Sequence, residues 1–528
     1  MASPAGLAFL LLVSSALLIS TAIGPASAGQ NQLQKRSPED SEKNTEGATA
    51  LSKFALSRID TITSVVCPFL YIIPVYGPLI SDLVKLTASE IKGYTDMDLL
   101  MGEFKHLNTK IDRYHVEQKW DSWASGDFHK PEKHIDLAWD KYTTLSQSLW
   151  KAKDDAEMER HKKDFRKAYE KYEPATKTLH NLLVKKGVSF RYPLGDALAE
   201  HANCHEKDIR AYTVFIYKLI YKGNTMNEYY YKLKNIESDA RSDEMASIAY
   251  NISSVMFQVH MQCIEKSMDY VIKDVKSLTD QKKSRSDLAK EVWSFLVKAY
   301  DRYDWMVVAF ISKKSKHTIL KFLNSHNLSR FTPVEEGIVT VAVARQVKGN
   351  HTLALKVKQA IGRCIDESVL CYKVAKKLSE CSELVKGKPV SQTYTAVHAY
   401  IRDAHDSQNA KKKQDEDYDV SAAPEDSPDQ YIHKGKCQKS PGVKGGKFVV
   451  LIKSDEEIMT NDPCSKLNCG EKKKRGSCVS IKGMFLAACE CKMPYYGQNC
   501  EESLDDYKKV LMATAPVVDS RRRLSGSG

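Results

Sequence analysis

Six cysteines near the C-terminus are the densest cluster of reactive side chains in this 528-residue chain. They follow the spacing C-x4-C-x8-C-x10-C-x-C-x8-C and are Cys464, Cys469, Cys478, Cys489, Cys491 and Cys500. A segment this short buries too little apolar surface to fold unaided, so its thiols are expected to form disulfides or to bind zinc. No histidine accompanies the cysteines, which favours disulfides. Spacing alone leaves fifteen connectivities open.

The cysteine frame resembles the epidermal-growth-factor-like (EGF-like) family. The single residue between Cys489 and Cys491, the eight residues before Cys500 and the turn Tyr496-Gly497-Gln498-Asn499 carry the resemblance. It implies a small β module that binds partner proteins. It also implies three bridges, which are Cys464 to Cys478, Cys469 to Cys489 and Cys491 to Cys500. Calcium-binding members carry an acidic or amide cluster before the first cysteine, and this chain has only Asn461-Asp462-Pro463, so no calcium site is expected.

Seven further cysteines lie upstream, and their number is odd. At least one of them is therefore expected to stay unpaired or to form an intermolecular disulfide. The sequence does not pair them, because a disulfide needs Cα atoms within about 7 Å. They are Cys67, Cys204, Cys263, Cys364, Cys371, Cys381 and Cys437.

Catalytic and metal-binding patterns are scarce. His201, Cys204 and His205 fall within one helical turn, but they lack the glutamate of an H-E-x-x-H zinc site, so a surface turn with Cys204 in a disulfide is the better interpretation. The chain has no G-x-S-x-G, no phosphate-binding glycine loop and no GxGxxG. We therefore expect no enzyme, no metal and no cofactor.

The N-terminus predicts secretion. An apolar run from Leu7 to Ile23 precedes Ala26-Ser27-Ala28, which fits a signal peptide of residues 1–28 cleaved after Ala28, whereas a retained membrane anchor is the alternative. Lys35-Arg36 indicates a propeptide of residues 29–36, or an uncleaved basic pair on a solvated tail. Three sequons could carry glycans in the secretory pathway, at Asn251, Asn327 and Asn350.

The net charge is +12, and removal of residues 1–36 leaves 77 basic and 67 acidic residues, or +10. Because both signs alternate along most of the chain, we expect solvated helix faces with some affinity for anionic surfaces, and no nucleic-acid partner.

Helical periodicity dominates from Leu51 to Asp415. Apolar residues at a 3-4-3-4-3 spacing run from Met97 to Tyr114, and similar stripes occupy residues 135–149, 212–233 and 288–310. Strand-like alternation is almost absent, so the expected fold is mainly α, an elongated helical bundle followed by a flexible linker and a small disulfide-rich EGF-like β module. The expected domains are residues 37–410 (helical), 411–463 (linker with a short strand at Phe448–Ile452), 464–501 (EGF-like) and 502–528 (polar tail).

The most apolar stretch of the mature chain is Val65 to Ile80, which three prolines interrupt. A buried, kinked core segment is one interpretation, and a concealed membrane-insertion element is the other. The residues that would enter a membrane are Val65, Phe69, Leu70, Ile72, Ile73, Val75, Leu79 and Ile80.

The helical region resembles cephalotoxin-like proteins over roughly residues 50 to 400. The matching stretches are Phe104 to Asp112, Trp120 to Gly126 and Ala138 to Tyr142. This resemblance implies a secreted, extracellular protein, either a toxin acting on membranes or a receptor, or a matrix or adhesion component such as those of mineralised skeletons. The partner is then a membrane surface or an extracellular protein.

Overall fold

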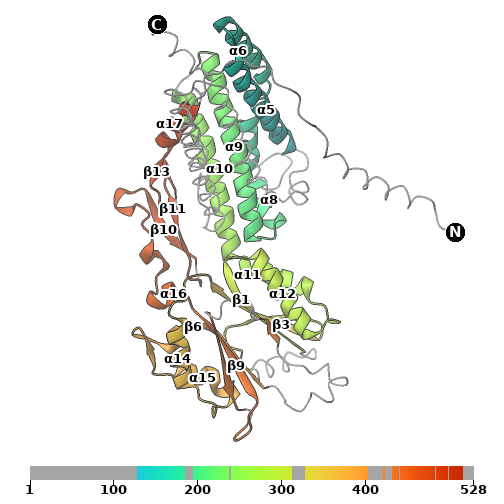
Figure 1. Ribbon diagram of the computed structural model, residues 1–528, viewed down its shortest axis with the longest axis vertical. Coiled ribbons are helices and arrows are strands. Elements are labelled where there is room, and N and C mark those ends of the chain that lie inside the picture. Colours follow the sequence, from blue (N-terminus) through green and yellow to red (C-terminus); the bar gives the residue numbers. More distant parts are fainter. Residues whose placement is uncertain are drawn as a thin grey trace, which may run out of the picture. The chain divides into compact units, whose positions relative to one another are not determined.

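The computed structural model (Figure 1) describes residues 128–184, 194–236, 239–311, 328–401, 420–422, 431–438, 440–481, 483–497 and 499–514. All of them belong to one compact unit, residues 50–528. Within that unit the chain forms a helical part, two antiparallel sheets with their own helices, and a cysteine-rich module.

The helical part is built around one buried helix. Helix α9 (Glu206–Leu233) packs against α5 (His129–Lys151), α7 (Ala175–Val184) and α10 (Asp239–Glu265). Apolar and aromatic side chains occur on every side of α9, so neighbours can cover it all round, and most of its residues are buried. The shorter helices α6 (Asp155–Tyr169) and α8 (Leu194–His201) complete this core.

Two of the predicted helices are confirmed. The stripe Ile135, Trp139, Tyr142, Leu145 and Leu149 lies on α5, and all five side chains are buried. The stretch from Tyr212 to Leu233 lies within α9. The earlier stripe from Met97 to Tyr114 lies outside the described residues.

The expectation of helix up to Phe310 is wrong. Helix α11 (Ser267–Leu278) is followed by α12 (Arg285–Ala299), and the next element is a strand, β1 (Tyr303–Ile311). The β1 sequence is rich in β-branched and aromatic residues, and both its faces are buried, so it shows no alternation that would mark it as a strand. A short apolar run of this kind satisfies helix and strand periodicity equally.

Two sheets therefore draw strands from residues 303–401, which we predicted to be helical, and from residues 420–452, which we predicted to be a linker. The first has the order β2-β3-β1-β7, with β2 (Thr332–Glu336), β3 (Val339–Val347) and β7 (Val420–Ala422). The second has the order β6-β9-β8, with β6 (Tyr394–Ile401), β9 (Gly446–Ile452) and β8 (Ile432–Cys437). Gly337, at a φ of +62°, occupies the turn between β2 and β3, where a left-handed conformation favours glycine.

Helices cover these sheets. Side chains of α11 and α12 share a core with β1 and β3, while α14 (Ala354–Cys364) and α15 (Val374–Ser379) share one with β6 and β9. The opposite face of the second sheet packs on Met306 and Ala344 of the first. A two-stranded ribbon, β4 (Leu384–Val385) and β5 (Lys388–Pro389), lies beside α14, and a short helix, α16 (Asp455–Met459), follows β9.

The predicted linker and tail both need correction. The strand at Phe448–Ile452 is confirmed within β9, but it pairs on both sides with β6 and β8, so this part of residues 411–463 belongs to a sheet. In the predicted polar tail, Leu504–Thr514 form helix α17, which packs on α9 and α10. Leu504 and Tyr507 are buried in the core. The spacing of Leu504, Tyr507 and Leu511 fits one face of a helix, so the sequence did carry a helical signal that the prediction of a polar tail missed.

Replacing Tyr507 with alanine tests whether α17 is part of the core. The ring is fully buried and its hydroxyl accepts a hydrogen bond from Asn224 (2.7 Å), so Tyr507→Ala is expected to lower the free energy of unfolding by about 3–5 kcal/mol in urea titrations. Lys509→Ala, on the exposed side of the same helix, is the matched control, with an expected change of at most about 0.5 kcal/mol. Equal stabilities of the two variants would contradict the packing of α17.

Candidate binding pocket on the cysteine-rich module

Three disulfides hold the module at residues 464–500. They join Cys464 to Cys478, Cys469 to Cys489 and Cys491 to Cys500, which are the pairs that the EGF-like resemblance implies. The central hairpin consists of β10 (Gly476–Ser480) and β11 (Ala487–Cys491), in which Cys478 lies opposite Cys489. The short strands β12 (Tyr495–Tyr496) and β13 (Glu502–Ser503) lead into α17.

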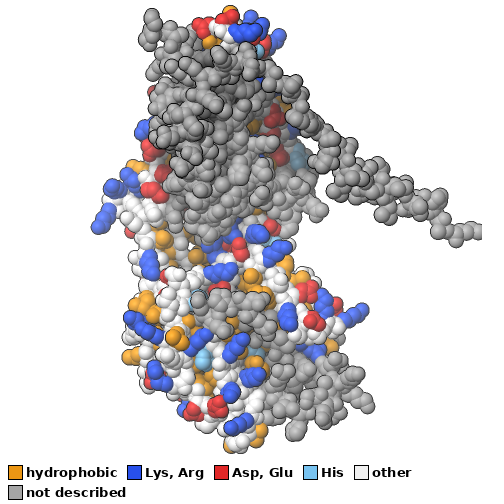
Figure 2. Space-filling view, viewed as in Figure 1, with side chains coloured by type: hydrophobic (Ala, Val, Ile, Leu, Met, Phe, Trp, Pro, Cys, Tyr) orange, Lys and Arg blue, Asp and Glu red, His pale blue; other side chains and the backbone are white. Residues whose placement is uncertain are grey.

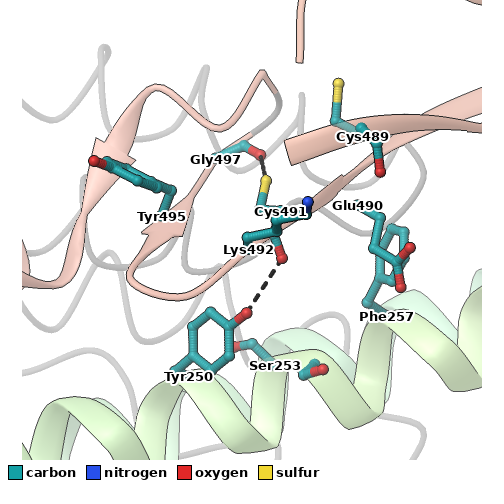
Figure 3. A pocket seen from close by; sticks show the side chains of 11 residues that line it. Tyr250, Ser253, Phe257, Cys489, Glu490, Cys491, Lys492, Tyr495 and Gly497 are labelled. Carbon is teal, nitrogen blue, oxygen red and sulfur yellow. Dashed lines mark hydrogen bonds between the residues drawn. The ribbon is translucent and has the colours of Figure 1, made fainter. Parts of the chain in front are cut away.

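The module packs on the helical part. Ile481, Ala488 and Tyr496 belong to the same hydrophobic core as α9 and α10. The Tyr250 hydroxyl of α10 donates a hydrogen bond to the carbonyl oxygen of Cys491 (3.2 Å), as Figure 3 shows. At the other end, Lys508 of α17 forms an ion pair with Asp243 (2.7 Å). The module is therefore fixed to α10 at several points.

A pocket of about 260 Å³ lies between α10 and the module. Tyr250, Ser253, Ser254 and Phe257 form its helical wall, since positions i, i+3, i+4 and i+7 share one face of a helix. In Figure 3 the Tyr250 and Phe257 side chains extend from the helix toward the strand that carries Cys489, Glu490 and Cys491. The remaining lining residues are Ser477, Lys492, Tyr495 and Gly497.

The pocket combines aromatic surface with hydrogen-bonding groups and one charge of each sign. Glu490 and Lys492 are exposed at its rim, and the Ser253 Oγ is buried without a hydrogen-bond partner in the described structure. Burial, together with the nearby Glu490 carboxylate, raises the pKa of Tyr250, so its hydroxyl stays a donor. These groups are suited to holding a small polar ligand or a partner's side chain.

Three other disulfides join six of the upstream cysteines. Cys204 pairs with Cys263 across α8–α9 and α10, Cys364 with Cys381, and Cys371 with Cys437. Cys204 thus lies in a disulfide as expected, and the adjacent His205 contacts Asp274 (2.9 Å). The seventh, Cys67, lies outside the described residues.

A buried ionic cluster joins the start of α9 to the sheets. The Glu206 carboxylate is fully buried and accepts from Arg302 Nε (2.5 Å), and His260 Nε2 lies 3.4 Å away. Arg210 lies 3.7 Å from the same carboxylate and binds both oxygens of Asp301. Burial alone would raise the pKa of Glu206, but Arg302, His260 and Arg210 outweigh it and lower the pKa to about 2.

Several predicted site residues cannot be placed. The cleavage sites at Ala28 and Arg36, the apolar segment from Val65 to Ile80, and Asn327 all lie outside the described residues. Asn251 lies on α10, half-buried, with its Nδ2 3.4 Å from His180. Asn350 is exposed in a loop and its Nδ2 donates to Glu456 (2.8 Å), so of these two sequons Asn350 is the more accessible.

Sequence reasoning did not find the pocket. The spacing of Tyr250, Ser254 and Phe257 marks one face of a helix, but nothing in the sequence shows that this face meets the module rather than another helix. In the described ranges, no three His, Cys, Asp or Glu side chains converge as metal ligands would. None of the helices described combines the length and apolarity needed to cross a bilayer.

Fold and crosslinks together define a disulfide-rich protein with a helical middle region and a C-terminal region that contains strands. Residues 95–285 match the family model described as the cephalotoxin-like middle helical domain. The matched residues include helices α5 to α11 and end where α12 begins. Neither a curated protein nor a solved structure matches the chain.

Because His260 is buried, we predict that acid lowers the stability of the folded protein. Burial lowers the pKa of this imidazole, whereas the unfolded chain takes up the proton near pH 6.5, so protons bind preferentially to the unfolded state and stability falls as the pH drops below that value. The expected result is a lower Tm at pH 5 than at pH 7, and a smaller difference between the two in His260→Gln. His433, whose pKa burial lowers to about 4, is the second site to replace. The same pH dependence in the parent and in His260→Gln would contradict this assignment.

Proposed function

We propose that this protein is a secreted cephalotoxin-like protein that acts on membranes or on a receptor through its helical domain. The observation that carries the proposal is the match of residues 95–285 to the cephalotoxin-like middle helical domain. The six disulfides support passage through an oxidising compartment, as does the predicted signal peptide. The resemblance to toxins favours a lytic or receptor-directed action over catalysis, so no enzymatic activity, cofactor or nucleic-acid partner is proposed.

An extracellular matrix or adhesion role is the second candidate. We interpret the module as EGF-like, because its three bridges and its β10–β11 hairpin follow the arrangement that the cysteine frame implies. EGF-like modules bind partner proteins, and the pocket between α10 and the module offers aromatic and charged groups to a partner. In this role the helical domain positions the module for binding and does not itself act on a membrane or a receptor.

Dye release from vesicles and lysis of cultured cells distinguish these roles. A membrane-directed toxin is expected to release dye from phosphatidylcholine vesicles, with or without phosphatidylserine, at one or more pH values between 5 and 8. Failure to release dye, together with no effect on cells, would remove the toxin proposal. Recovery of the native protein in an insoluble matrix fraction would then support the second role.

Mass spectrometry of the native protein tests secretion and crosslinking together. The mature chain is expected to begin at Gly29, or at Ser37 if Lys35-Arg36 is cleaved. Since the structure joins twelve of the thirteen cysteines in six disulfides, Cys67 is expected as one free thiol per chain or as the link of a disulfide-bonded dimer. Because Asn350 is more exposed than Asn251, a larger fraction of Asn350 is expected to carry glycan. Retention of Met1 with reduced thiols in the module would contradict secretion.

A further inference from the structure

Most of the net positive charge lies in one part of the chain. Residues 348–401 and 431–452 carry fourteen Lys and Arg against four Asp and Glu, a net charge of +10 in a chain whose total is +12. Residues 431–452 contain no acidic residue. These two segments form α14, α15 and the sheet β6-β9-β8, and we call this unit the basic body.

The basic body also exposes apolar side chains. Ten large hydrophobic residues are exposed in the described part of the chain, and four of them lie here. Two of the four, Tyr372 (56% exposed) and Val443 (47%), are next to lysines in sequence, Lys373 and Lys444. Single exposed apolar residues are common on protein surfaces, but exposed apolar residues beside lysines are typical of surfaces that bind membranes.

Covalent and hydrogen-bonded links bring these residues to one end of the sheet. Val443 and Lys444 lie in the turn between β8 and β9. The disulfide between Cys371 and Cys437 joins the segment before Tyr372 to the end of β8, and the Cys371 N–H donates to the Gln438 carbonyl (2.9 Å). Tyr372 therefore sits beside the base of the hairpin turn.

Two further lysines flank this end. Lys436 of β8 and Lys447 of β9 are directly opposite each other in the register, and both are exposed. Like charges at facing positions of an antiparallel pair are destabilising, so the two lysines do not stabilise the sheet. Their placement favours a role in binding. Lys436 forms one exposed ion pair, with Glu367 (3.3 Å), which is weak in water. We call this set the hairpin tip, which comprises Tyr372, Lys373, Lys436, Val443, Lys444 and Lys447.

Figure 2 shows hydrophobic side chains next to Lys and Arg side chains at the lower end of the basic body. We propose that the hairpin tip docks on the surface of a bilayer that contains anionic phospholipids. The lysines would contact the anionic headgroups while Tyr372 and Val443 enter the interfacial layer. An acidic polysaccharide would pair with the lysines and stack on the Tyr372 ring, but it gives no reason for exposing Val443 beside them.

This inference deepens the proposed action on membranes and names the surface that makes first contact. It differs from the earlier membrane hypothesis, which placed contact in residues 65–80. Docking through lysines weakens as salt is added and requires anionic lipid. Insertion of an apolar segment requires neither low salt nor anionic lipid. The two can therefore be measured separately.

The test is co-sedimentation of the full-length, disulfide-bonded protein with phosphatidylcholine vesicles that do or do not contain phosphatidylserine. Binding is expected only with phosphatidylserine and should weaken as salt is added. Each lysine near an anionic surface contributes about a fivefold gain in affinity, so the triple variant Lys436→Gln, Lys444→Gln and Lys447→Gln should bind about 100-fold more weakly. Tyr372→Ser combined with Val443→Ser should lower the affinity roughly tenfold.

Matched controls come from an exposed face of α5. Lys130→Gln combined with Leu137→Ser removes one exposed lysine and one exposed apolar side chain away from the basic body and should leave vesicle binding unchanged. Circular dichroism and Tm establish that each variant is folded. Equal binding by the parent and both hairpin-tip variants would overturn the proposal, as would binding to dextran sulfate without binding to vesicles. Vesicle binding without dye release would leave the docking surface standing while removing the lytic function.

Discussion

The buried carboxylate of Glu206 is the constraint around which the parts of this molecule are arranged. It stands at the first residue of α9, and its partners come from the same helix, from α10 and from the turn that enters β1. A charge removed from water is tolerated only where its partners are fixed, so the start of α9, the end of α10 and the chain entering the sheet must keep one geometry. The disulfide between Cys204 and Cys263 lies two residues before Glu206 and holds the same two helices together.

The parts of the chain differ in core composition, in net charge and in the presence of a pocket. The helical part has an aromatic-rich core and a surface of mixed charge, the basic body carries nearly all of the net charge, and the cysteine-rich module contributes a pocket where it meets α10. An electrostatically attracted surface sets where a protein accumulates, whereas a small pocket sets what it recognises there. In this protein the basic surface and the pocket lie on different elements of the chain.

Sequence reasoning succeeded where a pattern was long or a crosslink was dense. The stripe of α5 was found because it has one dominant periodicity, and the strand of β9 because a run of aromatic and β-branched residues follows Gly445 and Gly446. The pairing in the module followed a family resemblance. It failed for β1 and β3, because both strands are buried on both faces and so do not alternate. The pocket and the hairpin tip were invisible for another reason. Both depend on segments that are far apart in the chain, such as Tyr250 with Cys491, and no local pattern reports such contacts.

The position of Tyr507 has a consequence for how the protein is made. Its ring fills space between α9 and α10, more than 240 residues earlier in the chain, and its hydroxyl binds Asn224. During synthesis the helices emerge from the ribosome long before this side chain does. The space between α9 and α10 therefore stays unfilled until translation is almost finished. A chain terminated upstream of α17 would lack the ring that fills the space between α9 and α10.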